Sequence, residues 1–169
     1  MWVFGYGSLM WDDWETQFGC TQKITAILSG HRRVFNKASV RNWGTPEHPA
    51  PTLNLEESNN EHCTGFAFAF PNHQRQAVTQ SLKDREGRGF HFPELDILLP
   101  DGRVVGAVTP IYRGSNLIRD LSPGEIADMA KLARGESGAC RDYVITLAER
   151  LTELGINDRA VTTLREALR

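Results

Sequence analysis

Residues 2–9 are Trp2-Val3-Phe4-Gly5-Tyr6-Gly7-Ser8-Leu9, an apolar run that leads into a segment containing two glycines. The run predicts a short buried strand over 2–6 that ends in a turn at Gly7. Glycine frees the backbone at such a turn, and successive amide N–H groups can then form a concave site for a carboxylate. The alternative is a plain tight turn without a ligand. The segment lacks the third glycine of a dinucleotide-binding fingerprint and the G-x-S-x-G pattern of a serine hydrolase.

Strand signals continue through the N-terminal and central parts of the chain. The clearest is residues 63–70, in which aromatic and small residues alternate with a period of two from residue 65 to residue 70. Pro100-Asp101-Gly102 is a strong hairpin signal between two strand-like runs. The predicted strands are 21–29, 32–38, 52–56, 63–70, 95–99 and 103–112, with a break at Ser29-Gly30 and one intervening helix over 73–84.

The C-terminal part predicts helices. Ser122-Pro123-Gly124-Glu125 combines an N-cap serine, a proline at N1 and a glutamate at N3, which together form a capping box. Two further segments follow in which apolar residues recur at helical spacing. The first ends at Gly155, and the second begins with Asp158 as its N-cap. Strands first and helices last favour an α+β fold, with helices packed on a mostly antiparallel sheet or barrel, over a βαβ array.

The composition indicates a single globular domain over 1–169. The chain has 169 residues, 40% of them hydrophobic, and no long linker. A formal net charge of −2 gives no electrostatic case for a nucleic acid or an anionic membrane as partner. No run approaches the ~18–20 apolar residues of a membrane span, and the start of the chain lacks the features of a signal peptide. We therefore expect a cytoplasmic protein; its oligomeric state stays open.

Cysteines and histidines do not predict a metal site. The three cysteines are odd in number and have no C-x-x-C spacing, which argues against a disulfide framework or a zinc knuckle. The five histidines show no ligand spacing. A basic cluster is typical of the solvated side of a strand rather than of a phosphate-binding patch. Its members are His31, Arg32, Arg33, Lys37 and Arg41.

Acidic side chains also occur at the end of the predicted helix over 73–84, in the stretch Lys83-Asp84-Arg85-Glu86-Gly87-Arg88-Gly89-Phe90. A carboxylate there can serve as a general base if it points into an apolar cavity. The alternative is a solvated helix end, with Glu86 paired to Arg85 or Arg88.

Taken in order, several segments resemble one known family. The opening F-G-Y-G-S-L resembles the signature of the γ-glutamylcyclotransferase superfamily, and the segments that follow resemble its ChaC-like members over nearly the whole chain. These segments are Gly30-His31-Arg32-Arg33-Val34-Phe35, Gly44-Thr45-Pro46-Glu47, Asp84-Arg85-Glu86 with Gly89, Ala133-Arg134-Gly135-Glu136-Ser137-Gly138, and Arg141-Asp142-Tyr143.

This resemblance implies a small closed β-barrel with flanking helices and an enzyme without a metal or other cofactor. The substrate would be a small molecule, glutathione or another γ-glutamyl compound. The family's glutamate falls on Glu86, as general acid and base, and its pocket tyrosine on Tyr143. Backbone amides that hold the γ-glutamyl group fall on Tyr6, Gly7, Ser8 and Leu9. The chain departs from the family pattern at Phe90, after Arg41 and over 114–118, which leaves strict glutathione preference open.

The implied reaction is a ring closure within the substrate. Its α-amine attacks its own γ-carbonyl and releases 5-oxoproline, and correct orientation of such an attack can be worth about 7–11 kcal/mol. A free glutamate, with a pKa of about 4.3, is a weak base for an α-ammonium group, so we expect burial to raise the pKa of Glu86. The turn amides would bind either the γ-carbonyl oxygen or the α-carboxylate. A catalytically silent binding module with the same fold is the alternative class.

Overall fold

The computed structural model describes residues 1–169, and two long strands organise it. β2 spans Gln22–Ser39 and β3 spans Ala50–Ala69. We expected each of them to be two shorter strands, and that part of the prediction is wrong. Gly30 adopts φ = 72° inside β2, which glycine tolerates, so the strand continues through it. β3 continues through an exposed polar middle because strand pairing uses backbone groups, which every residue there has.

The chain divides into two compact units. The first contains Met1–Arg32 and Glu56–Gly114, and the second contains Arg33–Leu55 and Ser115–Arg169. β2 and β3 therefore each contribute residues to both units. The expectation of one domain over 1–169 stays a prediction.

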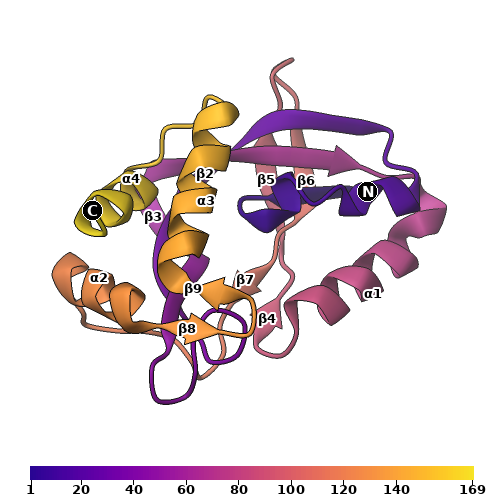
Figure 1. The fold of residues 1–169 in the computed structure, drawn as a ribbon. Coiled ribbons are helices and arrows are strands. Elements are labelled where there is room, and N and C mark those ends of the chain that lie inside the picture. Colours follow the sequence, from indigo (N-terminus) through magenta and orange to yellow (C-terminus); the bar gives the residue numbers. More distant parts are fainter. The chain divides into compact units, whose positions relative to one another are not determined.

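Five strands form a closed barrel in the order β1-β3-β2-β5-β6 (Figure 1). β1 (Trp2–Gly5) pairs antiparallel with β3 and parallel with β6 (Val104–Val108). β5 (Glu94–Leu98) is antiparallel to both β2 and β6. The predicted α+β fold with a mostly antiparallel closed barrel is confirmed, as is the hairpin turn at residues 100–102.

Close packing joins the first strand to β3. A Cβ atom on Gly65 would lie 2.3 Å from the carbonyl oxygen of Gly5 and 2.8 Å from the ring of Phe4. Only glycine allows the two backbones this approach. The apolar core beside them takes residues from several strands and helices of the first unit. Its buried members are Val3, Leu9, Trp14, Phe68, Phe70, Val78, Leu82 and Val108.

The helix α1 (Arg75–Glu86) follows the short 3-10 helix η3 (Asn72–Gln74). It begins and ends two residues later than predicted. Val78 and Leu82 are fully buried and fix one face of α1 against the core. Gly87 adopts φ = 78° directly after Glu86 and ends the helix there. Two short strands, β4 (Phe90–His91) and β7 (Ile111–Tyr112), pair beyond this point.

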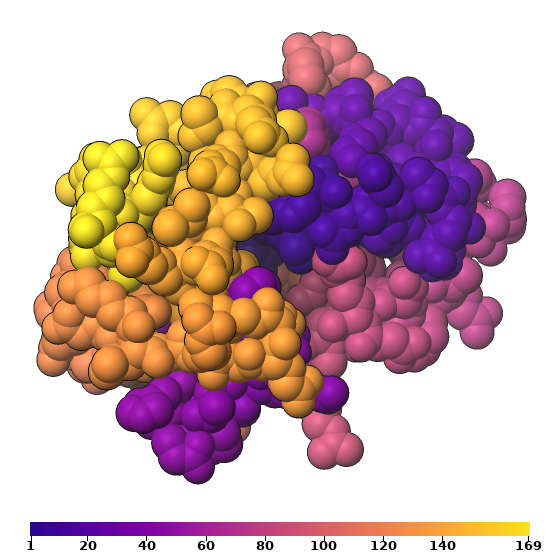
Figure 2. Space-filling model, in the orientation of Figure 1, coloured from indigo at the N-terminus to yellow at the C-terminus, as the bar shows by residue number.

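Three helices dominate the second unit: α2 (Pro123–Leu132), α3 (Cys140–Glu153) and α4 (Arg159–Ala167). They contact one another, and their atoms, orange to yellow in Figure 2, pack closely. The predicted capping box is present: the Ser122 hydroxyl accepts from the Glu125 N–H, and the Glu125 carboxylate accepts from the Ser122 N–H. Between α2 and α3, the strands β8 (Arg134–Gly135) and β9 (Gly138–Ala139) form a small hairpin that we did not predict.

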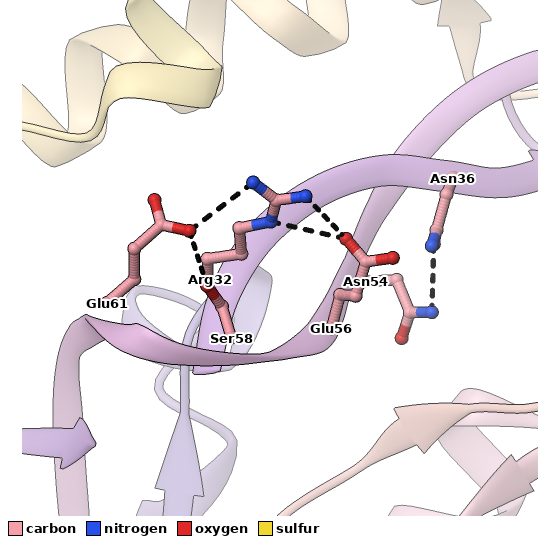
Figure 3. A network of polar contacts seen from close by, with 6 residues as sticks. All are labelled: Arg32, Asn36, Asn54, Glu56, Ser58 and Glu61. Carbon is pink, nitrogen blue, oxygen red and sulfur yellow. Dashed lines mark hydrogen bonds and ion pairs between the residues drawn. The ribbon is translucent and has the colours of Figure 1, made fainter. Parts of the chain in front are cut away.

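Two adjacent arginines of β2 have opposite environments. Arg33 is only 2% exposed, and its Nη1 lies 3.1 Å from Oδ2 of Asp158. The expectation that the basic cluster is solvated is therefore wrong for Arg33, because alternate residues of a strand face opposite sides. Arg32 is exposed as expected, and its guanidinium lies between Glu56 at 2.9 Å and Glu61 at 3.3 Å (Figure 3).

Candidate active site in the first unit

The turn after β1 opens a short 3-10 helix, η1 (Ser8–Met10). The Met10 N–H donates to the Gly7 carbonyl at 2.9 Å, and the Trp11 N–H donates to the Ser8 carbonyl at 3.2 Å. The first N–H groups of a helix have no acceptor within the helix, and those of Ser8 and Leu9 make no backbone hydrogen bond elsewhere. Leu9 is buried in the core, while Ser8 is exposed. The turn thus has two amide N–H groups, those of Ser8 and Leu9, that do not donate to a backbone carbonyl.

Tyr6 and the second short helix anchor this turn. The buried Tyr6 hydroxyl donates a 2.7 Å hydrogen bond to the Pro110 carbonyl, in the segment between β6 and β7. The indole N–H of Trp14, at the start of η2 (Trp14–Phe18), donates to the Leu9 carbonyl at 3.1 Å. Both bonds are buried, so they fix the course of the backbone on each side of Gly7 and Ser8.

Glu86 is the last residue of α1, and its side chain is 20% exposed. This carboxylate is partly buried rather than in bulk solvent. Its Oε1 lies 3.7 Å from Nε of Arg85, so the pairing with Arg85 that we considered is present, at ion-pair rather than hydrogen-bond distance.

Arg85 connects the end of α1 to the turn. Its Nη2 donates to the Ser8 hydroxyl at 2.8 Å and also to the Asp12 carboxylate. The first unit therefore brings together Glu86 and the turn that begins at Gly7, with one guanidinium in contact with both segments. The catalytic role of Glu86 and the binding roles of Tyr6, Gly7, Ser8 and Leu9 stay predictions.

Tyr143 lies in the second unit, in the first turn of α3. Its hydroxyl oxygen accepts a hydrogen bond from the Leu53 N–H at 3.2 Å. Its ring packs against Trp43, with the centroids 5.1 Å apart and the planes at 34°. These contacts give the tyrosine a defined orientation within its own unit, and its predicted place near the substrate stays a prediction.

The sequence did not indicate the part played by Asp12. Nothing in the stretch around it marks it as functional, and its partner Arg85 is 73 residues away. Arg85 itself was considered only as a partner of Glu86, and no local pattern predicted its bond to Ser8. Contacts of this kind depend on how distant segments meet, which no local signal in a single sequence reports.

Other chemistry-bearing groups have ordinary surroundings. No group of three or more His, Cys, Asp and Glu side chains is arranged to hold a metal ion. All three cysteines are free thiols, and burial raises the pKa of Cys140 to about 12. No helix of the chain has both the length and the apolar character needed to cross a membrane.

Among solved structures, the fold is that of γ-glutamylcyclotransferases. A crystal structure of a γ-glutamyl cyclotransferase specific to glutathione from yeast matches with a TM-score of 0.84 at 21% identity. The match covers 99% of this chain and 95% of the yeast chain. The predicted fold class is thus confirmed by comparison as well as by topology.

Sequence comparison then defines the family. The family model described as ChaC-like protein matches residues 1–169. "Gamma-glutamylcyclotransferase 2-3" from Arabidopsis thaliana is 33% identical over 181 residues, which cover 100% of this chain and 88% of the plant protein. The "Glutathione-specific gamma-glutamylcyclotransferase" of Escherichia coli is 32% identical over 170 residues, which cover 97% of this chain and 71% of the bacterial protein. The chain belongs to the ChaC-like family, and the predicted class of enzyme, a γ-glutamylcyclotransferase, is confirmed.

Proposed function

We propose that this protein cleaves glutathione into 5-oxoproline and cysteinylglycine, with Glu86 as general base and then general acid. One structural observation carries the proposal: Glu86 and the turn over residues 7–9 meet at the guanidinium of Arg85. The family membership supports the same reaction, because the E. coli relative is named as glutathione-specific. As part of this proposal, the protein acts in the reducing cytoplasm, where reduced glutathione is available.

The chemistry needs few groups because the substrate carries its own nucleophile. The α-ammonium group of the γ-glutamyl residue loses a proton to Glu86, and the amine nitrogen then forms a bond to the γ-carbonyl carbon. The tetrahedral intermediate collapses with cleavage of the C–N bond to cysteine, as Glu86 passes its proton to the departing nitrogen. The ring nitrogen also gives up its second proton, which the released amine takes up as an ammonium group, so two protons leave the α-ammonium group and two reach the leaving amine. Holding the γ-glutamyl arm folded is the main task of the site, worth about 7–11 kcal/mol in favourable cases.

The reaction also needs hydrogen-bond donors for an anionic oxygen of the substrate, and the turn supplies them. Amide N–H groups of Ser8 and Leu9 are unused by backbone hydrogen bonds and lie in a segment fixed by buried contacts on both sides. Fixed donors of this kind stabilise negative charge without reorganising during the reaction. In this proposal they bind either the γ-carbonyl oxygen or the α-carboxylate of the same substrate. The reaction as written uses no cofactor.

The choice of substrate is open to one specific alternative. The Arabidopsis relative has a name that specifies the cyclisation but no substrate, and Phe90 is one of the positions at which the sequence departs from the family pattern. The ring of Phe90 packs edge-on against Tyr112, with centroids 5.3 Å apart. Other γ-glutamyl amino acids or amines could therefore share the site.

The test is direct product analysis. Purified protein is incubated with reduced glutathione, and 5-oxoproline and cysteinylglycine are quantified by mass spectrometry, with a panel of γ-glutamyl amino acids in parallel. We expect equimolar appearance of the two products and faster turnover of glutathione than of the panel. Binding of glutathione without product would instead favour the catalytically silent module, and faster turnover of another γ-glutamyl compound would reassign the substrate.

A further inference from the structure

The guanidinium of Arg85, in the candidate site, lies near two carboxylates, those of Asp12 and Glu86. Nη2 of Arg85 hydrogen bonds with Asp12, whereas Nε of the same side chain stays 3.7 Å from Glu86. The donor set of Arg85 shows no hydrogen bond to Glu86, although the two residues are neighbours in the chain. The guanidinium of Arg85 therefore points toward the turn after β1.

Whether Arg85 donates its hydrogen bond to Asp12 or to Glu86 affects how good a base Glu86 is. A hydrogen bond from a guanidinium stabilises the ionised carboxylate and lowers its pKa. A general base with a lower pKa removes a proton from an ammonium group less readily. A Glu86 paired tightly with Arg85 would therefore be a poorer base than one whose arginine is held elsewhere.

From this geometry we infer that Asp12 is a positioning residue for the reaction. By holding the Arg85 guanidinium on the turn at Ser8, Asp12 keeps that cation from hydrogen bonding to Glu86 and so preserves the basicity of the Glu86 carboxylate. The inference rests on the proposed function, and specifically on Glu86 acting as the base. Asp12 does not touch the reacting atoms in this account; it acts through Arg85.

The other charged groups nearby do not have the same connection. On the helix and the following loop, Lys83, Asp84 and Arg88 are exposed. In the segment beyond β7, the guanidinium of Arg113 pairs with Glu57 at 3.5 Å. Tyr112 contributes a phenol whose ring packs against Phe90. Asp12 is the acid that accepts a hydrogen bond from Arg85, so its removal should change the cation beside Glu86 most directly.

The test compares pH profiles of variants with opposite charge changes. kcat for 5-oxoproline formation from glutathione is measured between about pH 5 and 9 at constant ionic strength, in the wild type, Asp12→Asn and Arg85→Gln. Asp12→Asn frees the cation for Glu86, so the acid limb should move to lower pH by about half a unit or more. Arg85→Gln removes the cation, so the acid limb should move to higher pH by a similar amount.

Three further variants make the outcome specific. Asp12→Glu keeps a carboxylate and should restore the wild-type limb. Asp13→Asn is the matched control, because Asp13 is the adjacent exposed acid and contacts Lys23 at 3.9 Å instead of Arg85. It should leave the profile unchanged. In the Arg85→Gln background, Asp12→Asn should shift the limb less than it does in the wild type, because no guanidinium remains to be redirected.

The results separate this inference from the proposed function. Absence of 5-oxoproline from the wild type would overturn the proposed function itself. An active wild type whose two variants move the limb in the same direction, or not at all, would overturn the role of Asp12. Loss of kcat with an unshifted limb would likewise assign Asp12 to structure alone. Thermal melting of each variant identifies any that fail to fold, and Asp12→Ser, which also removes the carboxylate, then replaces Asp12→Asn in the test.

Discussion

The guanidinium of Arg85 donates a 2.8 Å hydrogen bond to the hydroxyl of Ser8, which lies 77 residues earlier in the chain. Arg85 is the penultimate residue of α1, and Ser8 is the first residue of η1. The bond thus joins the end of the helix that carries Glu86 to the turn that presents the unused amides. The helix and the turn also contribute buried side chains, Leu82 and Leu9, to one apolar core, which holds the two segments beside each other.

Replacement of Glu86 by glutamine should abolish turnover while the protein still folds. The side chain is at a helix end and 20% exposed, so loss of its charge has little effect on packing. A positioned base typically contributes about 10²–10⁴ in rate, so kcat for 5-oxoproline release should fall by at least about 100-fold. Asp84→Asn is the control, since Asp84 is an exposed acid of the same helix that contacts Gln80. Near-normal turnover in Glu86→Gln would remove Glu86 from the mechanism.

Substitution of Gly65 by alanine should destabilise the barrel. The new methyl group would meet the Gly5 carbonyl oxygen at 2.3 Å and force β1 away from β3. Overpacking of this kind costs about 1–3 kcal/mol, which urea denaturation would report as a lower midpoint. Gly124→Ala is the comparison, because the nearest atom to its new methyl is 3.9 Å away and alanine favours a helix. It should be neutral or stabilising by up to about 1 kcal/mol; equal losses in both variants would contradict the steric explanation.

The two adjacent arginines of β2 should differ in their contribution to stability. Asp158→Asn removes the carboxylate beside the buried Arg33 but keeps a side chain able to cap α4. The expected loss is about 1.5–3 kcal/mol, the range for a hydrogen bond to a charged group. Glu56→Gln removes a carboxylate beside the exposed Arg32 and should cost at most about 1 kcal/mol. The measurement is chemical denaturation, and a larger effect at Glu56 than at Asp158 would contradict the assignment by burial.

Only one of the three cysteines should react with a thiol reagent in the folded protein. Thiols react as thiolates, and burial raises the pKa of Cys140 to about 12, so its thiolate is scarce at neutral pH. Cys63 is also fully buried. Burial raises the pKa of Cys20 too, but that side chain is partly exposed and should react slowly. Titration with a chromogenic disulfide should find one thiol natively and three in denaturant; fast labelling of Cys140 would show that its surroundings open readily.

Local signals in the sequence were enough for much of the fold. The capping box at Ser122–Glu125, the turn at Pro100-Asp101-Gly102 and the strand that opens the chain each depend on residues within one turn or one strand of each other. Their conformational preferences are set by near neighbours. The order of strands before helices then indicated the class of fold, and the ordered motifs indicated the family.

Tertiary structure alone decided which side chains meet. Neither the burial of Arg33 beside Asp158 nor the continuity of β2 through Gly30 follows from the stretches that contain them. The contacts of Arg85 with Ser8 and Asp12 join residues that are more than 70 positions apart. The partners of a side chain are the residues that the folded backbone places next to it. The packing of the whole core, rather than local conformational preference, determines which residues these are.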